Sequence, residues 1–307
     1  KDARVIDVIN DEAFGNYGRL IFPVDMRISN DLTLENISSI LPWYSEINTD
    51  KTVEIVNYLR NEAESGRQIF YDIYSDSEKA DDPEKQNTGI FFFKGNDNAK
   101  SAVVNAGGGF VYVAGIHDSF PHALELSKKG YNAFALIYRP GAQTACEDLA
   151  RAIAFLCAKS GAKEIYMLNR TKEKAYDIAK AVNDYFGKEC IKPMLISEYD
   201  KLEADDYVVI QTTSVGLYPN VDDVVIDDEA FYKKVKVGVD IIYNPSETRF
   251  MKMCKNAGKT TTLNQLIAEL KRNGVSFGAT SVGRDGESTD LVTNTVKPGI
   301  FVYKGTI

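Results

Sequence analysis

Three consecutive glycines in this 307-residue chain stand where they could stabilise a negative charge. Gly107, Gly108 and Gly109 lie in the motif NAGGGF, which follows a predicted apolar strand and precedes a predicted helix. Consecutive glycines allow backbone N–H groups to turn toward a developing oxyanion, as an acyl-transfer enzyme requires. The motif therefore predicts an oxyanion-binding loop, although three glycines alone do not establish one.

A second motif has the chemistry of a phosphate site. Asn169, Arg170 and Thr171 follow the predicted strand 164–168. A guanidinium can bind a phosphate through two hydrogen bonds, and a short hydroxyl adds another donor. The alternative interpretation is an exposed loop at the end of a strand, because contact with one phosphate does not hold a whole cofactor.

The amino-acid composition disfavours several classes of binding partner. The chain has 36 Lys and Arg against 44 Asp and Glu, a formal net charge of −8, which disfavours nucleic acid as a partner. Its four cysteines are widely spaced, which predicts reduced thiols and no metal site. No apolar stretch approaches the ~18 residues of a membrane span. We expect a cytoplasmic protein whose partner, if any, is a small molecule; the oligomeric state is not indicated.

Alternating strands and helices must position these motifs. Residues 52–63 predict a helix, and 68–74 and 89–93 predict two strands joined by a charged loop at 76–88. Further strands are predicted at 102–105, 133–138, 164–168, 192–196, 207–212 and 235–242, and helices at 119–129, 145–160, 172–186 and 247–257. Apolar strands separated by helices predict an α/β fold with a doubly wound, mostly parallel sheet. After residue 262 we expect a helix at 263–272 and a strand at 299–303.

The glycine motif belongs to a longer pattern that includes NDEAFG (10–15), RLIFPVD (19–25), HDSFPH (117–122) and YRPG (138–141). Residues 1–156 thereby resemble the N-terminal half of α/β-hydrolase esterases of the acetyl esterase/lipase type. The resemblance implies that a G-x-S-x-G turn with the nucleophilic serine follows the next strand, and that an acid and a histidine come later. The chain has NRTKEK in that place. Its two histidines, His117 and His122, both precede it, so we expect an esterase-like part without its nucleophile.

A different resemblance begins near residue 150. The motifs CAKSGAKEIYMLNRT (157–171), QTTSVGLYP (211–219) and VDIIYNPSETRF (239–250) occur in that order. Residues 150–262 thereby resemble the NADP-binding C-terminal domain of shikimate dehydrogenase. The resemblance implies NADP as cofactor, with the NRT motif at the adenosine 2′-phosphate and Tyr243 near the substrate. The further cofactor-binding residues that it implies are Thr212, Thr213, Ser214 and Gly216.

The turn that should hold the pyrophosphate departs from the family pattern. A dinucleotide site needs G-x-G-x-x-G between its first strand and helix, but strand 133–138 is followed by RPGAQT with the single glycine Gly141. Thr144 and Glu147 have the spacing of a capping box, which would satisfy the first N–H groups of the helix internally. We therefore expect NADP to bind weakly or not at all.

Together the two resemblances predict a composite chain. Its expected parts are 1–156, 157–262 and an unassigned 263–307, with the change inside helix 145–160. A natural, a recombined and a designed origin all fit this pattern. Three functions stay open: an NADP-binding protein of shikimate dehydrogenase type that is catalytically incomplete, an ester hydrolase without its usual nucleophile turn, and a non-catalytic α/β scaffold. The sequence identifies no catalytic residue.

Overall fold

The computed structural model describes residues 1–41, 47–242, 244–258 and 260–261. By its contacts the chain divides into two compact units, and the boundary between Ala152 and Ile153 lies inside a single helix, α5 (Ala142–Lys159). In the described part, unit 1 is residues 1–152 and unit 2 begins at residue 153. The assignment of 1–156, 157–262 and 263–307 to different relatives stays a prediction. The predicted elements after residue 262 lie outside the described residues.

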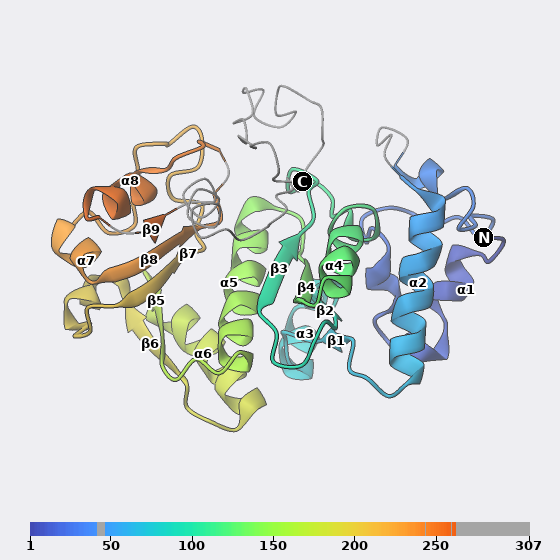
Figure 1. Cartoon of the computed structure of the whole chain (residues 1–307), viewed down its shortest axis with the longest axis horizontal. Helices are drawn as coiled ribbons and strands as arrows, with labels where there is room; N and C mark the ends of the chain where they lie inside the picture. Colours follow the sequence, from blue (N-terminus) through green and yellow to red (C-terminus); the bar gives the residue numbers. More distant parts are fainter. Residues whose placement is uncertain (42–46, 243, 259, 262–307) are drawn as a thin grey trace. The chain divides into compact units, whose positions relative to one another are not determined.

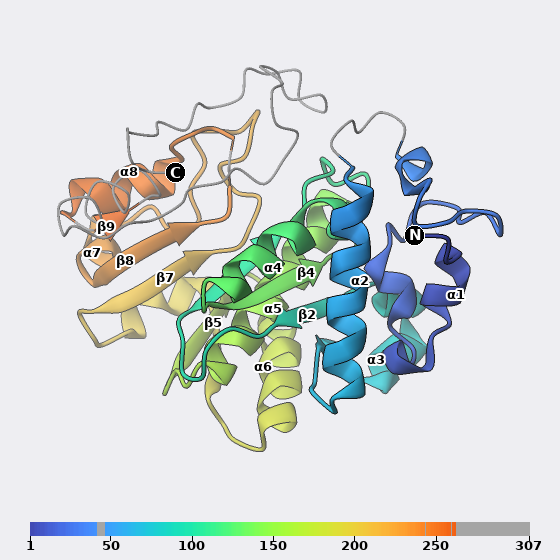
Figure 2. The same cartoon turned by 45° about the vertical axis from the view of Figure 1, so that its right-hand side comes forward.

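Unit 1 contains a four-stranded sheet of order β1-β2-β4-β3 (Figures 1 and 2). Its strands are β1 (Phe70–Tyr71), β2 (Gly89–Phe93), β3 (Ser101–Asn105) and β4 (Asn132–Ile137). Strand β4 pairs in parallel with β3, whereas β2 is antiparallel to both of its neighbours. The two central strands have the nearly continuous apolar sequences GIFFF and NAFALI. Such runs are expected because a strand in the middle of a covered sheet buries both of its faces.

Helices pack around this sheet. The longer ones are α2 (Thr49–Glu64) and α4 (Ser119–Lys128), and α4 lies along β3 and β4 with α2 beside it (Figure 1). The shorter helical segments are α1 (Val5–Ile9), η1 (Glu12–Phe14), η2 (Gly18–Ile21), η3 (Ile37–Ile40), α3 (Asp76–Asp81), η4 (Pro83–Asn87) and η5 (Gly115–His117). Phe91, Phe93 and Phe120 are fully buried between the sheet and α4, as expected of aromatic residues that pack a sheet.

The charged loop predicted at 76–88 is wrong. This segment forms α3 and η4. Ser75 accepts a hydrogen bond from the backbone N–H of Glu78, and the Glu78 carboxylate accepts one from the N–H of Ser75 in return, which is a capping box. Asp82 and Pro83 then begin the 3-10 turn. Local capping thus gives structure to a segment that has no apolar periodicity.

Unit 2 contains two parallel sheets. Strands β5 (Ile165–Asn169) and β6 (Ile191–Leu195) form one, and β7 (Tyr207–Gln211), β8 (Val235–Asp240) and β9 (Thr260–Thr261) form the other in that order. The connecting segments are α6 (Lys172–Phe186), η6 (Ile196–Lys201), α7 (Glu229–Lys233) and α8 (Arg249–Asn256). The α/β class with parallel strands is confirmed, although the described strands are divided among three sheets rather than one.

A buried ion pair fixes the turn between β4 and α5. Asp148, fully buried in α5, accepts hydrogen bonds from the backbone N–H of Arg139 at 2.8 Å and from its guanidinium at 2.7 Å. The Tyr74 hydroxyl donates to Asp148 at 2.7 Å and accepts from Arg139 at 3.0 Å. Burial opposes the charge on Arg139, but the Asp148 carboxylate raises the pKa of Arg139 above its ordinary value.

The capping box predicted at Thr144 and Glu147 is also wrong, because the helix begins earlier than that spacing requires. The helix begins at Ala142, so Thr144 is already inside its first turn, where its hydroxyl donates to the Gly141 carbonyl at 2.9 Å. Glu147 points toward Arg139, with 3.6 Å between the carboxylate and the guanidinium. The entry to α5 is therefore organised around Arg139 rather than by a side-chain cap.

We expect Asp148→Asn to destabilise unit 1 by about 3 to 5 kcal/mol, because it removes the buried counter-charge of the Arg139 guanidinium and leaves only the half-exposed carboxylates of Asp82 and Glu147 near it. Glu147→Gln is the matched control, since that carboxylate is half-exposed and lies farther from Arg139. Urea unfolding followed by circular dichroism measures both variants. Equal, small effects would contradict the assignment of the buried pair as the main support of this turn.

Candidate functional site

The NRT motif lies at the carboxyl end of β5, immediately before α6. Asn169 is the last residue of the strand, and its side-chain oxygen accepts a hydrogen bond from the backbone N–H of Thr171 at 3.0 Å. Thr171 is the N-cap of α6, and its hydroxyl makes no capping bond. Arg170 is exposed, and it has no ion-pair partner among the described residues. The motif thus places a guanidinium and a hydroxyl next to each other at the positive end of a 15-residue helix.

The second predicted loop lies at the carboxyl end of β7. Gln211 is buried, and its side-chain oxygen accepts hydrogen bonds from both the N–H and the hydroxyl of Thr213 at 2.6 Å. Thr213 is therefore engaged within the loop and its hydroxyl has little capacity for a ligand. Thr212 is half-buried and Ser214 is exposed, so their hydroxyls remain as candidate contacts.

Gly216 is required for the path of this loop. It is buried, with a φ of +95°, and a Cβ there would lie 3.1 Å from the carbonyl oxygen of Asp223. A role for Gly216 in shaping the loop is thus sufficient to explain the residue. The predicted substrate residue Tyr243 lies outside the described residues.

A half-buried carboxylate supports the same end of the β7-β8 pair. Asp240, the last residue of β8, accepts a hydrogen bond from the Thr248 hydroxyl at 2.6 Å and one from the backbone N–H of Ile242 at 3.0 Å. Burial raises the pKa of Asp240, and these hydrogen bonds partly oppose that shift. Thr248 in turn caps α8 through the N–H of Met251. Asp240 therefore holds the strand end and the helix start together, a role that no sequence motif had singled out.

In the glycine loop after β3, one of the predicted oxyanion donors is already in use. The backbone N–H of Gly107 donates to the buried carboxylate of Asp118 at 2.7 Å, so the protein's own anion takes this donor. Gly108 and Gly109 have φ of +142° and +60°, and a Cβ at Gly108 would overlap the carbonyl oxygen of Tyr112. The glycines are thus explained by the path of the loop.

The histidines do not pair with a nucleophile in the described part of the chain. His117 is buried, and neither of its ring nitrogens has a hydrogen-bond partner there. His122 donates a hydrogen bond from Nδ1 to the carbonyl oxygen of Asp118, 2.7 Å away. The serine nearest to His117 in the sequence, Ser119, donates its hydroxyl hydrogen bond to the Gly115 carbonyl. Among the residues that the structure describes, His117 therefore makes no contact of the kind that joins a base to a nucleophile in an acyl-transfer site.

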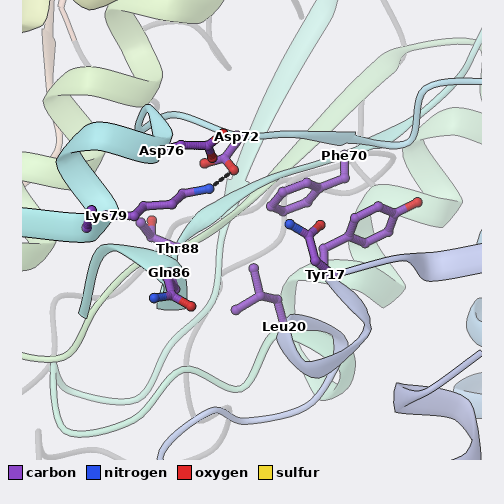
Figure 3. Close-up of a pocket in the computed structure, with 10 residues that line it drawn as sticks. Tyr17, Leu20, Phe70, Asp72, Asp76, Lys79, Gln86 and Thr88 are labelled. Atoms are coloured by element: carbon purple, nitrogen blue, oxygen red, sulfur yellow. Dashed lines mark hydrogen bonds and ion pairs between the residues drawn. The ribbon is translucent and has the colours of Figure 1, made fainter. Parts of the chain in front are cut away.

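Unit 1 also has a small pocket that sequence motifs did not predict (Figure 3). Its volume is about 360 Å³. Tyr17 stacks on Phe70 on one side, with ring centroids 4.7 Å apart, and Lys79 forms an ion pair with Asp72 on the other. The remaining lining residues are Asn16, Leu20, Asp76, Ala80, Gln86 and Thr88. The lining comes from segments that are separate in the sequence, and only folding brings them together.

No protein-family model matches this chain. Part of it is 38% identical over 112 residues to an NADP(+) shikimate dehydrogenase of Clostridium perfringens, covering 36% of this chain and 38% of that enzyme. The corresponding enzyme of Methanosarcina acetivorans is 38% identical over 118 residues, covering 38% and 41%. This chain resembles shikimate dehydrogenases over about a third of its length. The resemblance predicted from the motifs is confirmed, and the chain spans about two fifths of the length of these relatives.

Two solved structures show a limited likeness to this chain. A crystal structure of shikimate dehydrogenase in complex with NADP+ is 31% identical, with a TM-score of 0.31, and the alignment covers 44% of this chain and 47% of that one. The apo form of Thermogutta terrifontis esterase 2 is 13% identical, with a TM-score of 0.27, and the alignment covers 57% and 76%. Both TM-scores are low, so neither structure serves as a template for this chain. No helix in the described ranges is long and apolar enough to cross a membrane.

The buried His117 predicts a loss of stability in acid. Burial lowers its pKa from 6.5 to about 4. Between these values the unfolded chain binds the proton and the folded chain does not. Stability is therefore full above pH 6.5 and falls as the pH drops toward 4, by about 3 kcal/mol in all.

Urea unfolding at pH 7 and at pH 4.5 tests this expectation. His117→Leu should reduce the difference between the two pH values, because an apolar side chain leaves no unsatisfied ring nitrogen and binds no proton. His122→Leu, which alters the less buried histidine, is the control. An unchanged pH dependence in His117→Leu would show that other groups dominate.

Proposed function

We propose that unit 2 is a remnant of an NADP-binding domain that recognises the 2′-phosphate of NADP(H) through Asn169, Arg170 and Thr171. The strongest support is the exposed Arg170 at the N-terminus of α6. Beside it lies Thr171, whose hydroxyl makes no capping hydrogen bond to the helix. A phosphate there would accept from the guanidinium, from the hydroxyl and from backbone N–H groups. The relatives named above are NADP(+) enzymes, which agrees with a 2′-phosphate as the ligand.

The pyrophosphate half of the cofactor has no comparable support. The segment between β4 and α5 is Tyr138 to Gly141, and Arg139 within it is committed to Asp148. The N–H of Gly141 donates to the carbonyl oxygen of Phe110 at 2.8 Å. The residues that precede the first helical turn therefore do not form the glycine-rich cradle that a pyrophosphate needs. Affinity should come from the adenosine phosphate alone and should be weak.

Weak binding at one end of a dinucleotide does not support hydride transfer. Hydride transfer requires a nicotinamide held against a substrate, and no group in the described part of the chain is placed to do either. We propose that the protein binds the nucleotide without shikimate dehydrogenase turnover. In this proposal the remaining cofactor residues, Thr212 and Ser214, contribute at most polar contacts.

Binding of NADPH, followed by quenching of Tyr and Trp fluorescence, tests this proposal. We expect NADPH to bind in the high micromolar to millimolar range and NADH to bind at least about tenfold more weakly, since one charged hydrogen-bonded contact is worth about 1.5 to 3 kcal/mol. Arg170→Ala should abolish the preference for NADPH. Lys180→Ala, which removes a cation inside α6 and away from the motif, should leave this preference unchanged. Absence of NADPH binding at millimolar concentration would eliminate the proposal.

The esterase alternative has a direct test. A fluorophosphonate probe labels serines that are activated by a neighbouring base. We expect no labelling, because Asp118 occupies the Gly107 N–H and His117 has no serine partner in the described residues. A serine that is labelled at stoichiometric level, identified by peptide mass spectrometry, would restore the hydrolase interpretation. A matched sample denatured before labelling gives the background.

A further inference from the structure

The pocket of unit 1 lies at the end of the sheet where α/β proteins bind their ligands. Asp72, which lines it, follows the last residue of β1, and Thr88 precedes the first residue of β2. Because β2 is antiparallel to both β1 and β4, this is also the carboxyl end of β4, whose last carbonyl accepts a hydrogen bond from the Thr88 hydroxyl at 2.7 Å. Ligands of open α/β sheets bind outside the carboxyl ends of the strands. The lining contains no residue of the glycine loop at 107–109.

One wall of the pocket is aromatic. The ring of Phe70 lies directly over Gly89, where a Cβ would be 2.1 Å from the Cζ atom of the ring, so this position of the ring depends on the glycine. Tyr17 stacks on Phe70, and its hydroxyl donates to the Ala13 carbonyl at 3.3 Å, so its polar end is already engaged. Together with the buried side chain of Leu20, the rings give the pocket an apolar surface that suits a flat group.

Helix α3 supplies the side of the pocket that carries charge (Figure 3). Asp76, Lys79 and Ala80 line the pocket, and they share one face of the helix because they are three and four residues apart. The Lys79 side chain is only 13% exposed and forms an ion pair with Asp72. Ala80 has no side-chain atom beyond Cβ, so it leaves room in front of this face. The helix therefore presents a carboxylate and a paired ammonium to the cavity.

The polar groups of the lining leave a charged acceptor unused. The lining contains two carboxylates, Asp72 and Asp76, and one ammonium, Lys79, so it has an excess negative charge. The ammonium is paired with Asp72, and the Thr88 hydroxyl donates to a main-chain carbonyl. Among the residues that the structure describes, none forms a hydrogen bond or an ion pair with the Asp76 carboxylate. A ligand that supplies a hydrogen-bond donor with a positive charge therefore fits this site better than an anion.

We propose that this pocket binds a small organic cation, a primary amine joined to a single aromatic ring. The ring of the ligand lies against Phe70, and its ammonium donates to the carboxylate of Asp76. The volume of about 360 Å³ is near the lower end of the roughly 300–1,000 Å³ of ligand pockets, which suits one ring rather than a dinucleotide. This site is independent of the nucleotide site that we propose for unit 2.

NMR titration of the full chain with three probes of similar shape tests the site and its charge preference. 2-Phenylethylamine should bind in the millimolar range and shift the backbone amides of Asp72, Lys79 and Thr88. The neutral 2-phenylethanol should bind about threefold to fivefold more weakly, as expected when a solvent-exposed ion pair is lost, and the anion 3-phenylpropionate should not saturate. Equal binding of the amine and the alcohol would overturn the assigned charge. Amine shifts confined to residues outside the pocket, or no saturation at tens of millimolar, would overturn the site.

Two substitutions on α3 form a matched pair. Asp76→Asn should remove the preference for 2-phenylethylamine over 2-phenylethanol, whereas Asp81→Asn, the same change at an exposed residue of α3 outside the lining, should retain it. Phe70→Leu should weaken both probes and keep the preference between them. Amides of β2 and β4 report whether a variant is folded; if Phe70→Leu unfolds, the wild-type titrations and the α3 pair decide. A preference that survives in Asp76→Asn would overturn the role of this carboxylate and with it the proposal.

Discussion

The buried ion pair between Arg139 and Asp148 is the constraint on which the middle of the chain depends. It fastens the end of β4 to the second turn of α5 through the backbone N–H and the guanidinium of the same arginine. Tyr74 closes the network from the segment before α3. Arg151, one turn further along α5, donates to the Ile73 carbonyl and pairs with Glu78 of α3. Buried charges are tolerable only when fully paired, and this network meets that condition for Asp148.

This constraint also explains why a nucleotide site is incomplete. A pyrophosphate would have to approach the backbone between β4 and α5, but that backbone is held by Asp148 and by Phe110. Strand β4 is hydrogen-bonded on both edges, to β2 and to β3. It is therefore not available to pair with β5 or with β7. A strand cannot lie at the centre of two sheets at once. Because β4 is already paired with β2 and β3, it belongs to the sheet of unit 1.

The sequence predicted the elements well where apolar periodicity was strong, as in β2, β4 and α6. It missed α3 and η4, since short capped helices depend on Ser75 and Asp82 rather than on an apolar stripe. The motif residues 169–171 could be found because they are consecutive. Asp118, Asp148 and Asp240 could not, because each carboxylate acquires its role from donors on other segments that only the folded chain brings to it. The glycines 107–109 were interpreted as a site, yet their conformations are sufficient to explain them.

Charge placement distinguishes a site from a structural feature in both units. The Gly107 N–H points at a carboxylate that the chain supplies itself, so this donor is already satisfied and gains little from an added anion. Arg170 is the opposite case, since it is an exposed cation next to a helix N-terminus without a carboxylate partner among the described residues. The positive charge of the Arg170 guanidinium and the positive end of the α6 dipole lie side by side, and together they favour an anion of more than unit charge. A phosphate monoester satisfies that requirement better than a carboxylate does, so Arg170 rather than the glycine loop is the residue whose removal should change what the protein binds.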